Sequence, residues 1–515
     1  MKSTTARHQG RRVVQFLSAW AFALLITGCA NQSTLRHNEA GRPNAQVAAG
    51  QGAVAVRVSI NSTGLNQYFT YWQQMKLRRV GSSATDFDIA LNTDGAVGSA
   101  TYIGQVPPGE YEILSLSSEQ CGSMCISSYA KIERKEGRFV VEEGKLTYLG
   151  DLLYAGQAGS MATLIRGGEP TVPDFQRWLK SHYSGLATLP VITPATSAEL
   201  LKTESSVYAA LQFRAPGLMN AQLLDDGSAL FTSFSSALRR WQAGKGVVNI
   251  GTGIKGRVSA VVPISNQEWV AAGDFDQYRR TTDGGATWSV IESGLPTGTV
   301  IGMYKAGEGD LVVLLRDSAK LKALRGSFQS HTWQLMHEAP FAFSIWQGGL
   351  RDPVINRVAD RVMVFLPPDN GFFLDLKKYE TKPFATLPGV MGIGYSADNV
   401  LRCRCNKSGF WVAPYESRDD GKTWQDSTLD RGASVPVFKD AQNGFGMLAQ
   451  ALRVTHDGGQ TWQTVQQQSM APWPYLFQPY SMNFMFTPQR IIGTDGQTTL
   501  IGSEDDGKTW VSLLK

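Results

Sequence analysis

The sequence predicts an all-β protein whose C-terminal part is a seven-bladed β-propeller, with six blades as the alternative. A small β-sandwich and a short helical connector are expected before it. Three observations lead to this prediction. One eight-residue phrase occurs four times between residues 281 and 510, short alternating strands fill 51–155, and helical periodicity is confined to 156–204. The chain has 515 residues, of which 42% are hydrophobic and 18% charged, so an ordinary globular protein with more than one domain is expected.

The N-terminus has the layout of a secretory signal. Basic residues, among them Arg11 and Arg12, precede an apolar run that is shorter than a membrane-spanning helix and ends at Cys29. Its last four residues, Ile-Thr-Gly-Cys, resemble the bacterial lipobox, in which the chain is cut before the cysteine and the cysteine is lipidated. We therefore expect a signal peptide over 1–28 and a lipid anchor, with acyl chains such as palmitate, on Cys29. An ordinary signal peptide or an uncleaved anchor is the alternative.

The mature chain should be nearly neutral and attached to the outer membrane. The signal peptide removes four positive charges, and 5 − 4 leaves a formal charge of about +1, with acids and bases interspersed. Because there is no basic block, a nucleic-acid partner is not expected. Position two of the mature chain is Ala30, not the aspartate that retains many lipoproteins at the inner membrane, so attachment to the bacterial outer membrane is the prediction.

The remaining four cysteines form two close pairs. Cys121 with Cys125, and Cys403 with Cys405, suggest two local disulfides in an oxidising compartment. Thiolate pairs in a metal site are the alternative, but no histidine lies near either pair in the sequence and zinc normally takes four ligands, so no metal is expected. Cys403 and Cys405 would point to the same face of one strand, and a bridge there should be strained.

The segments before the propeller are expected to be a tether, a sandwich and a connector. Residues 29–50 are polar and read as a flexible tether. In 51–155, apolar residues alternate with small or polar ones from Val54 to Ile60, the pattern of a half-buried strand. The turn-and-strand stretch "PPGEYEI", followed by "FVVEEGKLTYLG", is similar to small prealbumin-type or immunoglobulin-like β-sandwich modules of bacterial surface proteins.

Two helices are expected in the connector, 156–204. Pro173 begins the first, which places Phe175, Trp178, Leu179 and Tyr183 on one face. We expect this aromatic face to pack on a neighbouring domain. Residues 196–199, Thr-Ser-Ala-Glu, fit a capping box before the second helix.

Residues 205–515 contain the repeated phrase, which reduces to [ST]-x-D-x-G-x-T-W. Each copy follows a strand-like stretch. The tryptophans at 424, 462 and 510 are 38 and 48 residues apart, and the 136 residues between 288 and 424 make about three periods of 45. Trp241 and Trp333 fall near the same period, and the place near Tyr379 has lost the motif. Repeats of this length with four short strands each predict propeller blades.

The phrase is identified as the Asp box, shared by sialidases, sortilin-type receptors and a photosystem II assembly factor family. The resemblance implies that each box caps the hairpin between the third and fourth strands of a blade. Residue types agree with a turn: the aspartate accepts backbone N–H groups, the glycine supplies a positive φ, and the tryptophan buries its ring. The residues concerned are Asp283, Gly285, Trp288, Asp419, Gly421, Trp424, Asp457, Gly459, Trp462, Asp505, Gly507 and Trp510.

Catalytic residues are harder to assign. Sialidases carry a Phe/Tyr-Arg-Ile-Pro sequence whose arginine binds the substrate carboxylate, and "FRAPGL" resembles it at Arg214. Such an enzyme also needs further arginines, an aspartate acid/base and a tyrosine nucleophile. The resemblance offers Tyr480 as nucleophile and Asp225 or Asp226 as acid, although the two aspartates lie in a hairpin-like "DDGS". The remaining arginine candidates are Arg279, Arg280, Arg402 and Arg490.

Two functions follow as hypotheses. The first is a lipid-tethered, non-catalytic binding or assembly protein whose propeller face holds a protein or glycan partner. Aromatic residues in 470–486 would suit such a surface, although core packing explains most of them. The second is a surface glycoside hydrolase resembling sialidases, and two-aspartate glycosidases on Asp-box propellers remain a further option. No cofactor is expected in either case.

Overall fold

The structure is a computed structural model that describes much of the chain. The described residues are 44–60, 72, 74–81, 86–92, 99–121, 125–132, 137–156, 161–214, 218–233, 237–307, 309–317, 320–341, 353–406, 412–427, 434–448, 451–467, 484–494 and 500–513. The predictions for the signal peptide, for Cys29 and for Tyr480 concern residues outside these ranges. Within them, no helix is long and apolar enough to cross a membrane.

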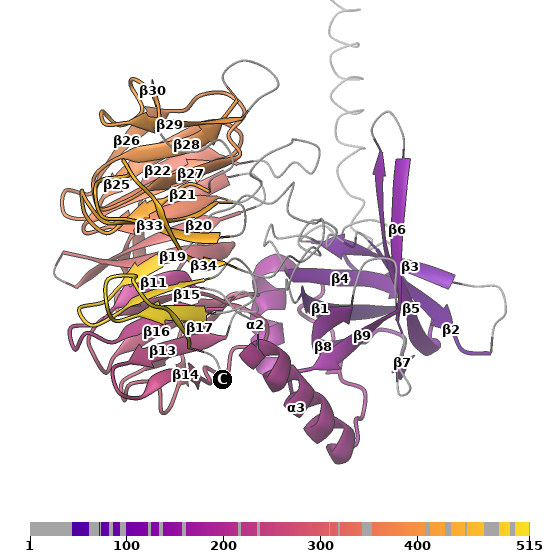
Figure 1. The fold of residues 1–515 in the computed structure, drawn as a ribbon. Coiled ribbons are helices and arrows are strands. Elements are labelled where there is room, and N and C mark those ends of the chain that lie inside the picture. The colour runs from indigo at the N-terminus through magenta and orange to yellow at the C-terminus, as the bar shows by residue number, and fades with distance from the viewer. Residues whose placement is uncertain are drawn as a thin grey trace, which may run out of the picture.

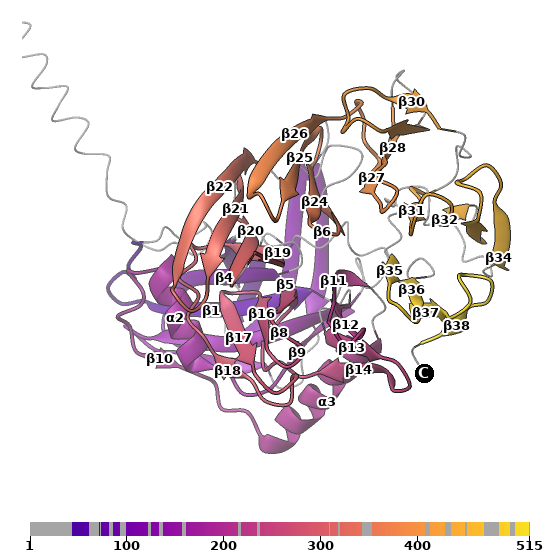
Figure 2. The same cartoon turned by 90° about the vertical axis from the view of Figure 1, so that its left-hand side faces the viewer.

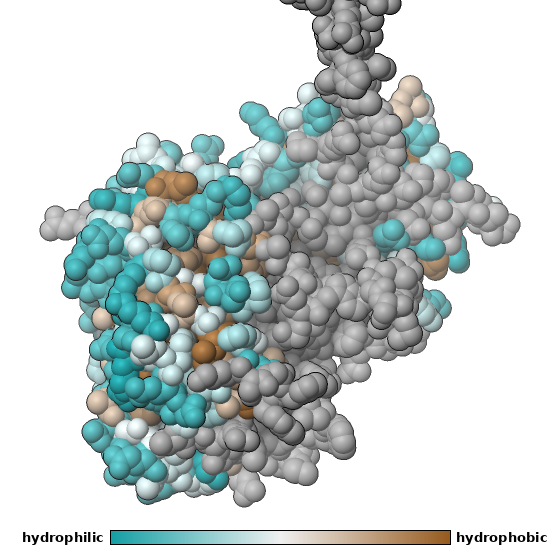
Figure 3. Space-filling model, turned by 90° about the horizontal axis from the view of Figure 1, so that it is seen from above, coloured by the Kyte–Doolittle hydropathy of each residue, from teal (hydrophilic) through white to brown (hydrophobic). Residues whose placement is uncertain are grey.

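Two bodies, joined through two helices, make up the described chain (Figure 1). The first is an N-terminal β-barrel. The second is a ring of four-stranded antiparallel sheets, which is a β-propeller (Figure 2). The side of the ring seen in Figure 3 is mostly hydrophilic, with apolar residues in small separate spots.

The N-terminal strands form one continuous sheet that closes on itself. Hydrogen bonding runs in the order β1-β4-β3-β2-β5-β6-β9-β8, and β8 pairs with β1 in parallel, while β7 and β10 add to β5 and β8. The strands are β1 (Gly52–Ile60), β2 (Gln74–Arg79), β3 (Asp86–Asn92), β4 (Ser99–Val106), β5 (Gly109–Cys121), β6 (Cys125–Ile132), β7 (Arg138–Val141), β8 (Leu146–Gly156), β9 (Met161–Arg166) and β10 (Val191–Ile192).

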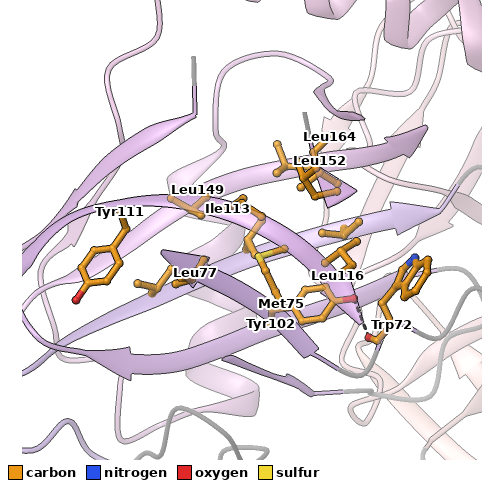
Figure 4. Close-up of a cluster of buried hydrophobic side chains, with 14 of the residues drawn as sticks. Trp72, Met75, Leu77, Tyr102, Tyr111, Ile113, Leu116, Leu149, Leu152 and Leu164 are labelled. Carbon is orange, nitrogen blue, oxygen red and sulfur yellow. Dashed lines mark hydrogen bonds between the residues drawn. The ribbon is translucent and has the colours of Figure 1, made fainter. Parts of the chain in front are cut away.

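This closure corrects the predicted β-sandwich. Alternation along a strand shows which side chains face a core, but it does not say which strands pair, so a sandwich and a barrel leave the same pattern. The barrel interior is packed with apolar side chains from Met75, Leu77 and Leu116 among others (Figure 4). Tyr102 is fully buried there, and its hydroxyl donates to the carbonyl of Trp72 at 2.8 Å.

Strand β1 is buried on both faces, although its alternation predicted a half-buried strand. Val54 and Val56 point into the barrel core. Ala53 and Ala55 point outward but are also fully buried, because helix α2 (Val172–His182) covers them. Small outward side chains allow the helix to approach the sheet closely. The alternation in the sequence predicts that these alanines face solvent, but they form the surface on which the helix packs.

Helix α2 packs its aromatic face on the barrel, as predicted. Phe175, Trp178, Leu179 and Tyr183 are all buried in the cluster that contains Ala53 and Ala55. The ring of Phe175 stacks on that of Tyr148 in β8 at 3.8 Å between centroids.

The second helix, α3 (Ala198–Arg214), differs from the prediction at both ends. The side chain of Ser197, not Thr196, accepts from the backbone N–H of Leu200 at 3.2 Å, while the hydroxyl of Thr196 accepts from Arg166. The helix continues ten residues beyond 204, so the propeller starts at Met219 and not at 205.

Seven four-stranded sheets follow within the described residues, each ordered as in the sequence. They are β11 (Met219–Leu223), β12 (Ala229–Thr232), β13 (Leu238–Gln242) and β14 (Gly246–Ile250); β15 (Val258–Pro263), β16 (Trp269–Gly273), β17 (Gln277–Thr281) and β18 (Ser289–Val290); β19 (Thr299–Ala306), β20 (Asp310–Arg316), β21 (Lys320–Ser327) and β22 (Thr332–Pro340); β23 (Val354–Val358), β24 (Arg361–Leu366), β25 (Asn370–Asp375) and β26 (Glu380–Ala385); β27 (Gly392–Tyr395), β28 (Leu401–Cys405), β29 (Ala413–Ser417) and β30 (Gln425–Asp426); β31 (Val437–Phe438), β32 (Gly444–Leu448), β33 (Ala451–Thr455) and β34 (Gln463–Gln467); β35 (Phe484–Phe486), β36 (Ile491–Thr494), β37 (Leu500–Ser503) and β38 (Val511–Ser512).

Side chains packed between neighbouring sheets hold the ring together. One apolar cluster joins the third and fourth sheets through Tyr304 and Val364, and another joins the fourth and fifth through Phe365 and Cys403. The last sheet packs against the first, because Phe231 of β12 and Ile492 of β36 belong to one buried cluster. The ring is therefore closed by side-chain packing, without a strand shared between its ends.

The two ends of the ring carry different connections. Successive strands of each sheet run antiparallel and the first strand lies innermost (Figure 2). The turns between first and second strands, and between third and fourth strands, therefore share one end of the ring, which we call the free face. The turns between second and third strands share the other end with the connections from sheet to sheet, and we call that end the barrel face.

Candidate functional site

The four repeated phrases each build the same turn between the third and fourth strands of a sheet. In the third copy, Asp457 accepts the backbone N–H of Thr461 at 2.9 Å and its hydroxyl at 2.6 Å. The hydroxyl of Thr455 donates to the same carboxylate at 2.8 Å and accepts the N–H of Gly459 at 2.9 Å. These hydrogen bonds lower the pKa of Asp457 to about 2. The same bonds recur at Asp283, Asp419 and Asp505, with the pKa again about 2.

All four box glycines have a left-handed backbone, and those at 285, 421 and 507 also approach the preceding sheet closely. Gly421 has φ +79°, and a Cβ on it would lie 2.4 Å from the carbonyl oxygen of Ala385 in β26. The indole of Trp424 donates to the same carbonyl at 3.3 Å. At Gly507, φ is +88° and a Cβ would lie 2.5 Å from the ring of Phe445. The boxes therefore act as turns that fit one sheet onto its neighbour.

The degenerate tryptophans do not all occupy the box position. Trp333 lies in the fourth strand of its sheet and Tyr379 directly before one, as the period of 45 requires. Trp241 lies instead in the third strand of the first sheet, where it is buried. Its distance in the sequence matches the repeat, but its position in the sheet does not.

The arginines considered as carboxylate ligands each bind a carboxylate of this chain. Arg279 pairs with Asp174 of α2 at 2.7 Å, and both side chains are buried. Arg402 pairs with Asp398 at 2.5 Å and with Glu416, beneath the ring of Phe438. Arg280 pairs with Glu268 at 2.7 Å, and Arg490 with Glu504.

The other catalytic candidates within the described residues are the end of a helix and two neighbours in one turn. Arg214 is the last residue of α3 and precedes the first strand of the ring, so this arginine ends a helix and does not belong to a blade strand. Asp226 accepts the N–H of Ser228 at 2.9 Å and pairs with Arg240 at 2.8 Å, as a hairpin residue would. Its neighbour Asp225 is exposed in the same turn.

The cysteine pairs lie in two separate strand systems. Cys403 and Cys405 are joined by a disulfide within β28, and both are buried. Cys121 and Cys125 are opposite each other where β5 pairs with β6. The described parts of the chain hold no group of three or more His, Cys, Asp or Glu side chains placed to bind a metal ion.

The barrel is docked on the barrel face of the ring. The loop between β16 and β17 places the ring of Phe275 at 4.6 Å from the guanidinium of Arg57 in β1. The connection before β15 places the N–H of Gly256 at 3.2 Å from the hydroxyl of Tyr208 in α3, and Lys255 at 2.9 Å from the carbonyl of Gly167. The free face lies at the opposite end of the ring.

A buried ion pair underlies this joint. Arg57 is fully buried and donates to both carboxylate oxygens of Asp151, at 2.6 and 2.9 Å. Burial by itself would lower the pKa of Arg57, but Asp151 and Tyr148 outweigh it and raise the pKa. The hydroxyl of Tyr148 donates to Asp151 at 2.9 Å. A buried charge is stable only beside its partners. The contacts of Arg57 with Asp151 and Tyr148 therefore hold this part of the joint in one arrangement.

A different arginine, in the propeller, lies at the centre of the ring. Arg357, in the innermost strand β23 of the fourth sheet, donates from Nη1 to the side-chain oxygen of Gln222 in β11 at 2.8 Å. Gln222 is buried, and its amide nitrogen donates to the carbonyl of Met303 in β19 at 3.3 Å. The side chains of Arg357 and Gln222 and the backbone carbonyl of Met303 come from the innermost strands of the fourth, first and third sheets, so they meet in the middle of the ring.

Arg357 differs in its surroundings from the paired arginines. It is exposed to solvent, it lies next to the turn between β23 and β24, and it therefore opens toward the free face. Partial desolvation of its guanidinium lowers the pKa of Arg357, and this effect outweighs Tyr304 and Asp360, which act to raise it. The sequence contains no motif around "VINRVAD" that marks this arginine, and only the folded ring brings Gln222 to it.

Comparisons with known proteins show similar folds but no family. No family model matches the chain, and no curated protein matches it. Among solved structures, "YCF48 bound to D1 peptide" is 19% identical, with a TM-score of 0.40 over 56% of this chain and 92% of the other. An ancestral GH74 enzyme is 12% identical (TM-score 0.40, 58% and 47%). Virginiamycin B lyase from Staphylococcus aureus is 10% identical (TM-score 0.37, 56% and 94%).

Proposed function

We propose that this chain is a lipid-anchored protein of the bacterial outer membrane, attached through Cys29. Its propeller, with the seven described sheets as its blades, is a non-catalytic binding or assembly module for a protein or glycan partner. The barrel occupies one face of the ring and helps to hold it away from the membrane, and the partner binds on the free face.

One observation carries the non-catalytic part of this proposal. The arginines that a sialidase-like carboxylate clamp would use, Arg279, Arg280, Arg402 and Arg490, are each paired with a carboxylate of the chain itself. An arginine held in this way positions strands and joints, and its charge is already compensated by a carboxylate of the chain, which weakens its attraction for a substrate carboxylate. The accessible free face supports the binding part.

The binding role is tested by site-specific photo-crosslinking in living cells. A photoreactive residue replaces Leu223, which is 49% exposed at the free-face end of β11, or Leu335, which is 51% exposed on the outer strand β22. We expect discrete adducts from position 223 and none from 335. Equal labelling at both positions, or none at either, would contradict a partner on the free face.

The catalytic alternative is tested with a fluorogenic sialoside. Wild type and Arg214→Ala are compared for release of the aglycone. We expect no turnover by either protein. Turnover by the wild type that is lost in the variant would replace the binding proposal with a glycoside hydrolase.

The lipid anchor is tested by cell fractionation. Because lipid on Cys29 would be the attachment and cleavage would occur at this cysteine, Cys29→Ser should remove the protein from the outer-membrane fraction and leave it uncleaved, held at the inner membrane by its apolar signal segment. The matched control is Cys403→Ser, which breaks the disulfide of the propeller and should leave any folded protein with the outer membrane. A cleaved Cys29 variant that remains in the outer-membrane fraction would refute the anchor.

A further inference from the structure

The centre of the free face carries a cation whose partners in this chain are neutral. Arg357 donates from Nε to the carbonyl of Ala359 at 2.9 Å and from Nη1 to the amide oxygen of Gln222 at 2.8 Å. Within the described residues it makes no ion pair with a carboxylate. The arginines of the ring that do so are Arg240, Arg257, Arg279, Arg280, Arg325, Arg361, Arg402, Arg418 and Arg490.

The guanidinium is oriented before any ligand arrives. Gln222 is 4% exposed, and the bond from its amide nitrogen to Met303 turns its oxygen toward Arg357. The ring of Tyr304 flanks the guanidinium, with its centroid 5.7 Å away. A guanidinium has five N–H groups, of which these contacts use two, so three remain as donors in a fixed plane. Orientation in advance reduces the entropy that a ligand must overcome.

We propose that Arg357, held by Gln222, is a binding site for a carboxylate group presented to the free face. This inference rests on the proposed binding function and names the chemistry that the partner supplies, from either an acidic sugar or an acidic amino-acid side chain. A planar carboxylate matches the fork of Nη1 and Nη2 and can accept two parallel hydrogen bonds.

The charges around the site favour a single negative charge over a phosphate dianion. Arg357 is the one cation in the central contact described above, and the carboxylate of Asp360 acts on it electrostatically. Asp360 is itself paired with Lys377, at 2.6 Å, on the outer side. Arg357 neutralises a ligand with one negative charge, whereas a second negative charge on the ligand would be repelled by the carboxylate of Asp360.

The first test measures binding of small probes to the full-length protein in detergent at low ionic strength. Isothermal titration calorimetry with propionate, which mimics an acidic amino-acid side chain, and with glucuronate separates the two carboxylate sources, and inorganic phosphate is the comparison. We expect at least one carboxylate to bind, and Arg357→Gln to weaken it by tenfold or more. The control Arg418→Gln removes an arginine that is 72% exposed and should change the affinity less than twofold.

A second variant keeps the test decisive if Arg357→Gln does not fold. Gln222→Glu places a carboxylate of nearly the same shape at the oxygen that already faces Arg357, at the loss of the hydrogen bond from the amide nitrogen to Met303. We expect this internal carboxylate to occupy the guanidinium, to keep the ring folded by circular dichroism, and to abolish probe binding.

Three results would overturn the inference: no carboxylate binding by the wild type, unchanged binding by a folded Arg357→Gln or Gln222→Glu protein, or a clear preference for phosphate. These results are distinguishable from failure of the proposed function. A partner crosslinked from position 223 together with absent carboxylate binding would reject the site but keep the binding module. Carboxylate binding without any crosslinked partner would keep the site but reject the binding module on the free face.

Discussion

Each box aspartate is a turn residue whose charge is stabilised by short-range hydrogen bonds. At Asp505, the N–H and hydroxyl of Thr509 and the hydroxyl of Ser503 all donate to the carboxylate. These donors favour the ionised form, which explains the pKa of about 2 without any buried charge. A low pKa is sometimes a sign of a catalytic group, but here the donors of the turn account for it.

Acid should weaken the propeller through these turns. The ordinary aspartate pKa is 3.8 and the folded value is about 2 for the four box residues. Their contribution to stability is thus complete above about pH 4 and is lost as the pH falls through about 2. We expect the free energy of unfolding, measured in urea, to fall across this interval.

The pH effect can be assigned with neighbouring aspartates. Asp505→Asn should reduce the slope between pH 4 and 2, because the residue that titrates in the turn is gone. Asp506→Asn removes an adjacent aspartate that reaches only Lys439, at 2.7 Å, and should leave the slope unchanged. Equal slopes in the two variants would show that the hydrogen bonds of the turn do not lower the pKa of Asp505.

Box glycines can be tested against a glycine that differs only in its surroundings. Gly421 and Gly244 have φ values of +79° and +76°, but a Cβ at 421 would collide with Ala385 while one at 244 meets nothing within 4 Å. Gly244→Ala should therefore cost about 1 kcal/mol, the cost of the backbone conformation alone. Gly421→Ala should cost at least about 1 kcal/mol more in chemical unfolding. Similar losses would mean that the close approach to β26 is unimportant.

The helix α2 is the element that the barrel and the ring share. Its aromatic face lies on the barrel, while its first turn carries Asp174, which pairs with Arg279 of the ring. The periodicity of Phe175, Trp178 and Leu179 made this helix and its buried face predictable. Nothing in the sequence marked Asp174 as a buried partner, because its arginine is 105 residues away.

Removing one ring from this helix should loosen the barrel. Phe175→Ala leaves a cavity beside Tyr148, and large-to-small changes of this kind cost roughly 3–5 kcal/mol. Lys180→Ala on the exposed side of the same helix is the control and should cost less than about 0.5 kcal/mol. Thermal unfolding followed by circular dichroism compares the two, and a similar small loss in both would show that α2 is only a linker.

At the scale of the whole molecule, the barrel and the ring are joined by polar contacts as well as apolar ones. Arg279 and Asp174 are both buried at the joint, whereas the next residue, Arg280, is paired with Glu268 and is 34% exposed. Removing one partner of a buried pair leaves a charge without compensation, which costs far more than breaking a surface pair.

The adjacent arginines give a matched test of the joint. Arg279→Gln should lower the free energy of unfolding by roughly 3 kcal/mol or more and should separate barrel and ring unfolding into two steps. Arg280→Gln should cost no more than about 1 kcal/mol and preserve the wild-type profile. Differential scanning calorimetry measures both, and equal effects would refute the buried joint.

How far the sequence predicted the molecule depended on the range of the interaction. The box turns and α2 were predictable because their residues lie within eleven positions of one another. The closed barrel, the extension of α3 to Arg214 and the contact between Arg357 and Gln222 were not, because each depends on segments brought together by the fold. The prediction that β1 is half-buried was wrong for the same reason, since α2 covers Ala53 and Ala55.

The central structural claim is that the last sheet packs against the first and closes the ring. It is tested most directly by a double-mutant cycle between Phe231→Leu in β12 and Ile492→Ala in β36, which share a buried cluster. The control cycle combines Phe231→Leu with Met363→Ala, which packs between the fourth and fifth sheets. We predict a coupling energy above about 0.5 kcal/mol for the first pair and additivity for the control. Additivity in both cycles would mean that the ring is open where this account closes it.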